Sequence, residues 1–191
     1  MFDPEGPVLG IDPGVSRCGY GAVAPRRGGA LDAPDYGVIR TPRSAPLPER
    51  LALLAVELDR LVRDLRPSAL AVERVLFQAN TRTAMAVGQA SGLALAVAGR
   101  ARVPVFHYSP NEVKLAVTGD GRADKVQVQL MVARLLGLAQ APRPADAADA
   151  LALCVCHLGS AGLRTAAGEQ APVVDGLSRA VAAAVAKEGD R

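Results

Sequence analysis

Aromatic residues are scarce in this sequence of 191 residues, which has three Phe, three Tyr and no Trp. Half of the residues are nonetheless hydrophobic, so Ala, Leu and Val must fill the core. The N-terminus has neither a basic segment nor an apolar run, which argues against a signal peptide. The longest weakly polar run, residues 84–99, is too short to cross a bilayer and contains Gln89 and Ser91. We therefore expect a cytoplasmic protein.

Cysteine and histidine are also few. The three cysteines cannot form a disulfide framework, because one would be left over. Residues 154–157, Cys-Val-Cys-His, look like a metal motif, but zinc needs four well-spaced ligands and the chain has only two histidines. We expect buried, reduced thiols on an apolar helix instead. His157 lies about 16 Å along that helix from Asp146, so we interpret it as structural or peripheral. We expect His107 to lie in the core or to be hydrogen bonded.

Length and charge limit the possibilities further. A chain of this size forms one well-filled domain and is too short for two ordinary ones. We expect that domain over residues 1–160 and a mobile, Ala- and Gly-rich tail over residues 161–191. The net charge is +3 and the isoelectric point is about 9.0. A mildly basic surface suits a polyanionic substrate, but +3 is equally ordinary for a soluble protein, and both interpretations stay open.

Hydrophobic periodicity predicts an α/β protein. Short connections between the first three predicted strands indicate antiparallel hairpins. Leucines recur at intervals of three and four from Leu51 to Leu65, which predicts an amphipathic helix that ends before Pro67. Strands then alternate with helices, so we expect a mixed sheet covered by helices. The predicted strands are Val8–Asp12, Cys18–Ala24, Tyr36–Thr41, Ser68–Glu73 and Val103–Tyr108. The other predicted helices are Thr83–Arg102, Asn111–Val117, Ala123–Leu136 and Asp146–Leu158.

Four acidic residues occupy positions that can bring them together. Asp12 and Glu73 each end an apolar strand, and these strands would lie side by side if the two acids are to meet. Asp146 and Asp149 are three residues apart on a helix and therefore share a face. Four acids in one cleft repel each other unless cations hold them, and one or two Mg²⁺ or Mn²⁺ ions are the economical solution. The pattern predicts phosphoryl chemistry.

Each acid also has a simpler explanation. Asp12 before Pro-Gly can satisfy backbone donors in a turn, and Glu73 can mark the end of a strand. Acids in a first helical turn interact favourably with the helix dipole, which accounts for Asp146 and Asp149. The joint pattern of two strand ends followed by a helix is more specific than any of its members.

Several motifs together resemble the bacterial RuvC-type Holliday-junction resolvases, in order from about Val8 to about His157. They are Gly10-Ile11-Asp12-Pro13-Gly14, Val72-Glu73-Arg74-Val75, Val87-Gly88-Gln89-Ala90, Asn111-Glu112-Val113-Lys114, Gly121-Arg122-Ala123-Asp124-Lys125 and Asp146-Ala147-Ala148-Asp149-Ala150-Leu151. The resemblance implies a ribonuclease H-like fold, with a mixed five-stranded sheet and helices on both faces. It also implies a homodimer that resolves four-way junction DNA with Mg²⁺ by paired symmetric nicks, in recombination and repair. A branch-migration helicase complex is the implied partner.

The resemblance also implies roles for single residues. Asp12, Glu73, Asp146 and Asp149 match the family's catalytic acids and metal ligands, with two Mg²⁺ ions per site and Mn²⁺ as a plausible substitute. We expect Asp12 to be shared by both ions, as in two-metal nucleases. Glu73 and Asp149 would complete the separate shells, and Asp146 would bind directly or through water.

Six further residues are candidates for contacts with DNA. Lys114 and Lys125 are expected beside the phosphate, because lysine is a compact charge suited to backbone contacts. An aromatic side chain after Glu73 could stack on an unpaired base. In the family, however, an aromatic aligns with Leu76, so the choice between Leu76 and Phe77 stays open, and Phe77 could equally be core. Arg74 and Arg82 are candidates for phosphate contacts.

Three other functions are alternatives to junction cleavage. One is a ribonuclease H-like nuclease that acts on structured RNA. Another is a catalytically silent junction-binding protein, which predicts no dependence on divalent metal. An actin-like sugar kinase also has Asp-x-Gly after its first strand, but it usually needs two such domains and a longer chain.

Overall fold

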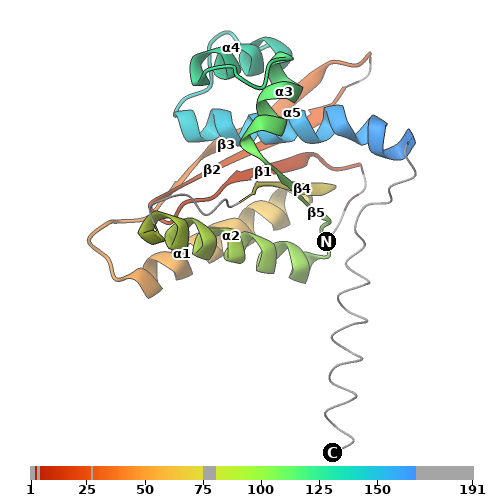
Figure 1. The fold of residues 1–191 in the computed structure, drawn as a ribbon. Coiled ribbons are helices and arrows are strands. Elements are labelled where there is room, and N and C mark those ends of the chain that lie inside the picture. The colour runs from red at the N-terminus through yellow and green to blue at the C-terminus, as the bar shows by residue number, and fades with distance from the viewer. Residues whose placement is uncertain (1–2, 4, 27, 75–80, 167–191) are drawn as a thin grey trace, which may run out of the picture.

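A computed structural model describes residues 3, 5–26, 28–74 and 81–166, except for the side chains of residues 81–83 and 161–166. This part of the chain contains five strands and five helices (Figure 1). The strands are β1 (Val8–Asp12), β2 (Arg17–Pro25), β3 (Leu31–Arg40), β4 (Ala69–Glu73) and β5 (Val105–Tyr108). The helices are α1 (Leu47–Leu65), α2 (Thr81–Ala101), α3 (Pro110–Thr118), α4 (Lys125–Leu135) and α5 (Ala145–Ala166).

The strands form one mixed sheet in the order β3-β2-β1-β4-β5. The first three strands pair antiparallel, whereas β1 with β4 and β4 with β5 pair parallel. In the register of β1 and β4, Ile11 lies opposite Val72. The next residue is Asp12 in β1 and Glu73 in β4. The prediction that these two strands lie side by side is therefore confirmed.

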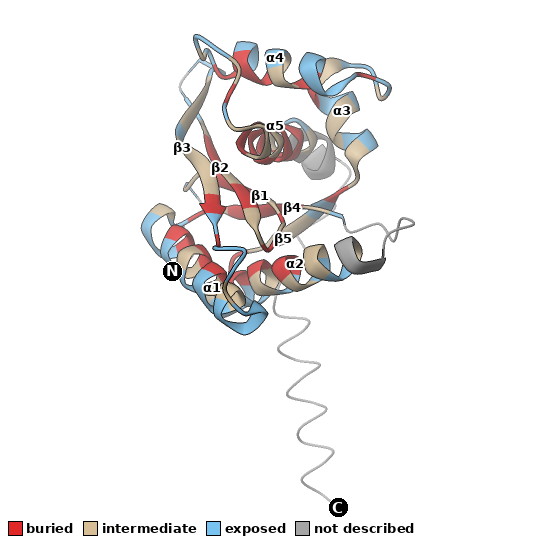
Figure 2. Ribbon diagram, turned by 90° about the vertical axis from the view of Figure 1, so that its left-hand side faces the viewer, coloured by how far each residue is buried: buried red, intermediate tan, exposed pale blue. Residues whose placement is uncertain are grey.

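Helices cover both faces of the sheet, as predicted. Helices α1 and α2 lie on one face, α5 lies across the other, and α3 and α4 cover the outer side of α5 (Figures 1 and 2). Most of the described side chains of α5 are buried, including all of those at 150–157 (Figure 2). A helix enclosed on all sides is apolar all round, which explains why its sequence is so rich in Ala and Leu.

Glycines in the sheet let α5 come close. A Cβ atom added at Gly10 would overlap the carbonyl oxygen of Ala150, and one at Gly19 would overlap that of Asp146. The backbone of α5 therefore rests on β1 and β2 where these strands have no side chains. Contact at this range positions the first turn of α5 beside the ends of both strands.

The leucine pattern of α1 is confirmed, with Leu54, Leu58 and Leu61 at most 1% exposed. The helix begins at Leu47, four residues earlier than the predicted pattern, after Pro46. It ends at Leu65 and is capped by Arg66, whose backbone is left-handed (φ 46°) and whose N–H donates to the carbonyl of Val62. The αL conformation stops the helix before Pro67.

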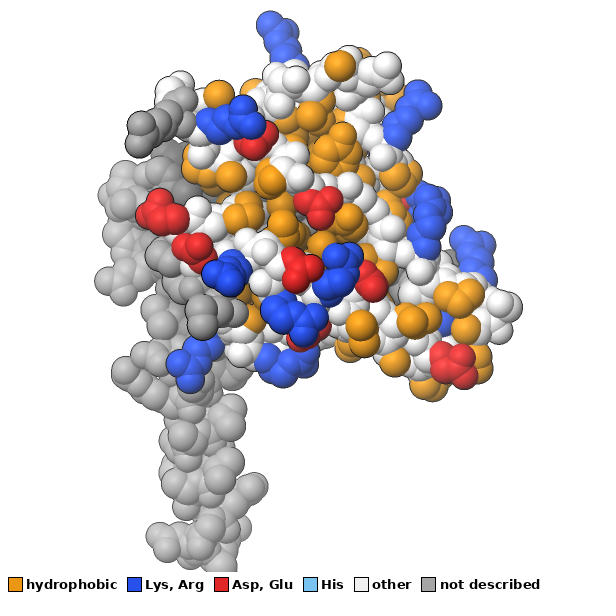
Figure 3. Space-filling model, turned by 180° about the vertical axis from the view of Figure 1, so that it is seen from behind, with side chains coloured by type: hydrophobic (Ala, Val, Ile, Leu, Met, Phe, Trp, Pro, Cys, Tyr) orange, Lys and Arg blue, Asp and Glu red, His pale blue; other side chains and the backbone are white. Residues whose placement is uncertain are grey.

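The edge strand β3 begins at Leu31, five residues earlier than predicted, and it contains Pro34. Proline cannot donate to a ladder and is confined to edges and bulges. Here both conditions hold, because the register with β2 shifts between Ala22 and Ala24, opposite Pro34. Seen from behind, the molecule shows acidic and basic side chains mixed with hydrophobic ones, without a large area of one sign (Figure 3).

The predicted buried thiols are confirmed: Cys18, Cys154 and Cys156 are not joined in disulfides, and they are at most 1% exposed. Burial raises the pKa of Cys18 to about 12, so this thiol stays neutral at physiological pH. Cys154 lies where α5 crosses the sheet, and its Sγ donates to the carbonyl of Gly21 at 3.2 Å.

The last helix is longer than predicted. The predicted end of the domain at residue 160 falls inside α5, which continues to Ala166. Residues 167–191 lie outside the described part of the chain, so a separate tail stays a prediction. Across the described residues, none of the helices combines the length and apolarity that a membrane crossing requires.

Candidate active site

Asp12, Glu73, Asp146 and Asp149 line one cleft of about 500 Å³. They come from three elements: Asp12 ends β1, Glu73 ends β4, and the two aspartates lie in the first turns of α5. Lys114 and Lys125 also line the cleft. The structure thus brings together all four predicted acids and both predicted lysines. Apolar side chains of α3, α4 and α5 form the rest of its wall, namely Pro110, Val113, Val128, Ala152 and Leu153.

The acids perturb one another. Burial, followed by the negative charges of Asp149, Glu73 and Asp146, raises the pKa of Asp12 to about 7. Burial and the charge of Asp149 also raise the pKa of Glu73, although a hydrogen bond with the Asp12 side chain opposes that shift. Without added positive charge, the cluster therefore retains a proton near neutral pH.

Lys125 supplies one positive charge inside the cleft. Its Nζ donates to Oδ2 of Asp149 at 2.7 Å, and this hydrogen bond raises the pKa of Lys125. Lys125 is the first residue of α4, and a capping box fixes that helix start. The Asp124 side chain accepts from the N–H of Gln127 at 2.9 Å, and the Gln127 side chain accepts from the N–H of Asp124 at 2.8 Å.

Lys114 reaches the cleft from α3, which also starts with a capping box. The hydroxyl of Ser109 accepts from the N–H of Glu112 at 3.3 Å, and Glu112 accepts from the N–H of Ser109 at 2.7 Å. Two capped helix starts thus place one lysine each beside the acids.

Arg17 is a residue that the sequence prediction missed. It begins β2, and its Nε donates to Oδ2 of Asp146 at 2.9 Å, while its Nη2 bonds to the same oxygen. A signal was present: an arginine five residues after Asp12, at the start of the neighbouring strand, lies near the same end of the sheet. The partner could not be found from sequence, because the position of α5 depends on tertiary packing.

The remaining predicted DNA contacts are less defined. Arg74 is exposed after β4, where its N–H donates to the carbonyl of Tyr108 at 2.8 Å, and it does not line the cleft. Arg82 lies in α2, but its side chain is not described. Leu76 and Phe77 lie outside the described residues, so the choice between them stays a prediction.

The two histidines differ in their surroundings. His157 is buried, its Nδ1 lies 2.8 Å from the hydroxyl of Tyr108, and its ring packs against Phe106 at 4.5 Å between centroids. The structural interpretation of His157 is confirmed. His107 is exposed on the outermost strand β5, so the expectation of a core position is wrong. Partial burial of its ring and the charge of Arg74 lower the pKa of His107.

The donor set suits a hard cation. Four carboxylates offer only oxygen ligands, which Mg²⁺ and Mn²⁺ prefer. Burial and the acidic neighbours raise the pKa of Asp12, so a cation in the cleft would stabilise its ionised form. Within the described ranges, however, no group of three or more His, Cys, Asp or Glu side chains is arranged to hold an ion. Asp146 and Asp149 are instead bound to Arg17 and Lys125.

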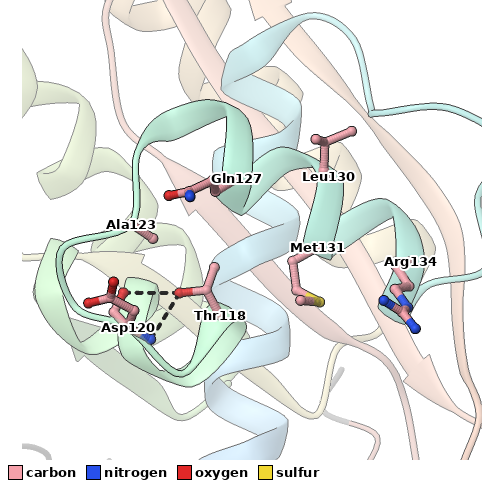
Figure 4. A pocket seen from close by; sticks show the side chains of 7 residues that line it. All are labelled: Thr118, Asp120, Ala123, Gln127, Leu130, Met131 and Arg134. Atoms are coloured by element: carbon pink, nitrogen blue, oxygen red, sulfur yellow. Dashed lines mark hydrogen bonds between the residues drawn. The ribbon is translucent and has the colours of Figure 1, made fainter.

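A second hollow of about 370 Å³ lies between α3 and α4 (Figure 4). Thr118, Asp120, Ala123, Gln127, Leu130, Met131 and Arg134 line it. Its most polar part is a local turn, in which the Thr118 hydroxyl donates to the carbonyl of Asp120 and accepts from its N–H. None of the predicted site residues lines this hollow, so the chemistry is assigned to the acidic cleft.

Comparison with known proteins identifies the family. Residues 8–157 match the family described as crossover junction endodeoxyribonuclease RuvC. The RuvC of Frankia casuarinae is 53% identical over 151 residues, which cover 79% of this chain and 88% of the relative. The RuvC of a Parafrankia species is 48% identical over 176 residues, covering 90% and 99%.

Solved structures agree with this result. Thermus thermophilus RuvC in complex with a Holliday junction substrate superimposes with a TM-score of 0.80 at 37% identity, over 88% of this chain and 99% of that chain. The yeast mitochondrial Holliday junction resolvase, at 17% identity and a TM-score of 0.61, shares the fold. The predicted ribonuclease H-like architecture is confirmed. This chain belongs to the RuvC family of crossover junction endodeoxyribonucleases.

Proposed function

We propose that this RuvC-family chain nicks two opposed strands of a Holliday junction by metal-dependent hydrolysis, and that Asp12, Glu73, Asp146 and Asp149 form its catalytic site. One observation carries the assignment: the four acids come from β1, β4 and α5 and line a single cleft with two lysines. Titratable groups in a cleft whose pKa values are shifted by burial and by one another mark a candidate functional site, and Asp12 and Glu73 meet this description.

The four carboxylates would hold Mg²⁺, with Mn²⁺ as a substitute and two ions per site. When bound, Mg²⁺ supplies a Lewis acid that lowers the pKa of its water and stabilises charge on the leaving oxygen. The residues of the chain position the reaction. Asp12 and Glu73 are fixed by the sheet, and Asp146 and Asp149 by the buried helix α5. Lys114 and Lys125 approach from the opposite wall, where their charges suit a phosphate.

The proposed substrate is four-way junction DNA. Its support is membership of the family and the likeness to the Thermus protein, which was solved with a Holliday junction substrate. Lys125 binds Asp149 in this structure, and a phosphate of the incoming strand would offer its ammonium group a second anionic partner. Leu76 or Phe77 is proposed to stack at the junction centre, and Arg74 and Arg82 to contact the backbone.

We further propose that the enzyme acts as a homodimer, because opposed nicks on a symmetric junction call for two related sites. The exposed face of α2 supports this proposal. It carries Met85, Gly88, Gly92, Ala96 and Gly99 in one stripe without charge, and Met85 is 66% exposed. Cβ atoms added at the three glycines would meet nothing within 4 Å, so a second backbone can approach closely.

Two wider roles complete the proposal. A branch-migration helicase complex is proposed as the partner in recombination and repair, on the strength of family membership. We propose the bacterial cytoplasm as the location of the reaction, in keeping with the bacterial relatives.

A synthetic mobile four-way junction tests the proposed function. We expect symmetric nicks on two opposed arms with Mg²⁺ and none with EDTA. Matched linear duplex and a structured RNA of equal length serve as competing substrates. Preferential cutting of the RNA would support the alternative nuclease, and junction binding without cutting at any metal concentration would support a silent binding protein. Either result would overturn the proposal.

A further inference from the structure

Arg17 holds the Asp146 carboxylate by a single oxygen. Both Nε and Nη2 of the guanidinium donate to Oδ2, whereas Oδ1 accepts no hydrogen bond from the described residues. The pair is partly exposed, at 39% for the Arg17 side chain and 27% for that of Asp146. One half of the carboxylate is therefore fixed and the other half is available.

The position of Arg17 follows from strand geometry. Alternate residues of a strand point to the same face, so Arg17, Gly19 and Gly21 share one face of β2. Cβ atoms added at Gly19 and Gly21 would run into Asp146 and Leu151 of α5, so this face lies against the helix. Arg17 is the first member of this row, and its long side chain reaches the first turn of α5.

A cationic side chain at the start of a helix is unfavourable unless it has an acidic partner. The N-terminus of a helix carries partial positive charge, which repels cationic side chains. Arg17 nevertheless lies at the start of α5, so its carboxylate partner determines its position. Two donors of one rigid planar group converge on Oδ2 and hold this oxygen in place more strictly than a single ammonium contact would.

Arg17 also differs from Lys125 in what it reaches. Lys125 lines the cleft and lowers the pKa values of Asp12 and Glu73, whereas no such influence of Arg17 on either acid is found. Arg17 is absent from the lining of the cleft and approaches Asp146 from β2. An ion could therefore enter without displacing it.

We propose that Arg17 is a positioning residue, which fixes Asp146 so that its free oxygen serves as a ligand for the divalent ion. The inference rests on the proposed function, because it assumes that Asp146 is a metal ligand. Hydrogen-bonded partners of metal ligands typically change metal affinity or activity about 10- to 100-fold. Arg17 would act through Asp146 alone.

Mn²⁺ binding measured by calorimetry, without DNA, tests this role directly. We expect Arg17→Ala to weaken Mn²⁺ binding about tenfold, and Arg17→Lys to recover part of the loss. In cleavage assays the Mg²⁺ concentration for half-maximal rate should rise in parallel. The matched control is Arg40→Ala, since Arg40 lies opposite Arg17 in the register of β2 and β3, is exposed, and has the same charge. It should leave Mn²⁺ binding unchanged.

A double variant separates positioning from other roles. If Arg17 acts only through Asp146, Arg17→Ala combined with Asp146→Asn should bind Mn²⁺ no more weakly than Asp146→Asn alone. A further loss in the double variant would overturn the inference. So would tighter Mn²⁺ binding by Arg17→Ala, which would show competition, or normal Mn²⁺ binding with weaker junction binding in EDTA, which would show a phosphate contact.

Two results separate this inference from the proposed function. If Asp146→Asn binds Mn²⁺ as the wild type does, the proposed ligand set is wrong and the role of Arg17 falls with it. If Asp146→Asn weakens binding but Arg17→Ala does not, only the positioning role is wrong. Thermal unfolding of each variant identifies loss of fold, and Arg17→Lys replaces Arg17→Ala if the alanine variant is unfolded.

Discussion

Lys125 and Asp149 are joined by a hydrogen bond of 2.7 Å, although 24 residues separate them in sequence. The bond connects the first residue of α4 to the acid of α5 that lies deeper along the helix. It joins the two walls of the cleft, and it places the positive charge where a phosphate would approach the acids.

Lys125→Ala should weaken binding to junctions of every DNA sequence. It should also reduce, by about one, the slope of the logarithm of the association constant against the logarithm of the salt concentration. The reason is that one phosphate contact releases about one counterion. Binding is measured in EDTA, so that cleavage does not interfere. Arg63→Ala, an exposed substitution on α1, is the control and should leave the slope unchanged. An unaltered slope for Lys125→Ala would exclude the phosphate contact.

Each single substitution of an acid by its amide should abolish cutting while the fold and junction binding persist. The variants are Asp12→Asn, Glu73→Gln, Asp146→Asn and Asp149→Asn. Loss of an outer partner of a metal site already costs about 10- to 100-fold, so loss of a ligand should cost about 100-fold or more. Single-turnover cleavage and junction gel shifts measure the two properties separately. A variant that cuts at near-normal rate would lose its assignment as a ligand.

The metal-free protein should lose stability as pH rises from about 4 to about 7. Asp12 has a folded pKa of about 7 against 3.8 in the unfolded chain, so the folded state binds more protons in this window. Below pH 3.8 both states are protonated and the group contributes nothing, whereas above pH 7 the penalty is complete.

Thermal unfolding in EDTA at pH 5 and pH 8 checks this expectation. Asp12→Asn should raise the unfolding midpoint at pH 8 by several degrees, since about 1 kcal/mol corresponds to about 2–4 °C for a protein of this size. The gain should be smaller at pH 5. Mg²⁺ should stabilise the wild type at pH 8 through binding to the folded state. Equal midpoint changes at both pH values would contradict the assigned cause.

Gly19→Ala should destabilise the fold and impair cutting together. Its Cβ atom would overlap the backbone of Asp146, which cannot move without displacing α5. Overpacking of this kind costs about 1–3 kcal/mol. Gly159→Ala is the matched control, because it lies in α5 with nothing within 4 Å and should be neutral or stabilising. Chemical denaturation with cleavage rates at saturating Mg²⁺ distinguishes the two variants.

Gly92→Glu should convert the proposed dimer to a monomer, because it places a charge in the exposed stripe of α2. Val56→Glu is the control, since Val56 on α1 is 64% exposed and lies outside the stripe. Sedimentation analysis measures the mass, and junction cleavage reports whether paired nicks are lost. A Gly92→Glu protein that keeps the wild-type mass would place any dimer contact elsewhere.

The sequence pattern predicted a feature correctly where that feature depends on a single helix or strand. The leucine spacing of α1, the apolar ends of β1 and β4, and the three-residue spacing of Asp146 and Asp149 are set by the periods of helix and strand. The predicted start of β3, Tyr36, is five residues too late, because a proline such as Pro34 usually interrupts a strand. Only the sheet showed that this proline lies at an edge beside a shift in register.

The pattern of residue types and their spacing predicted a mixed sheet covered by helices and four acids in one cleft, and the resemblance to the family added Lys114 and Lys125 as candidates. Tertiary structure alone decided that Arg17 binds Asp146, that Lys125 binds Asp149 and that His107 is exposed. The two ion pairs depend on where α4 and α5 pack in the fold. The backbone of α5 comes close to β1 and β2 because Gly10 and Gly19 have no side chains, but sequence spacing alone does not tell which helix lies against them.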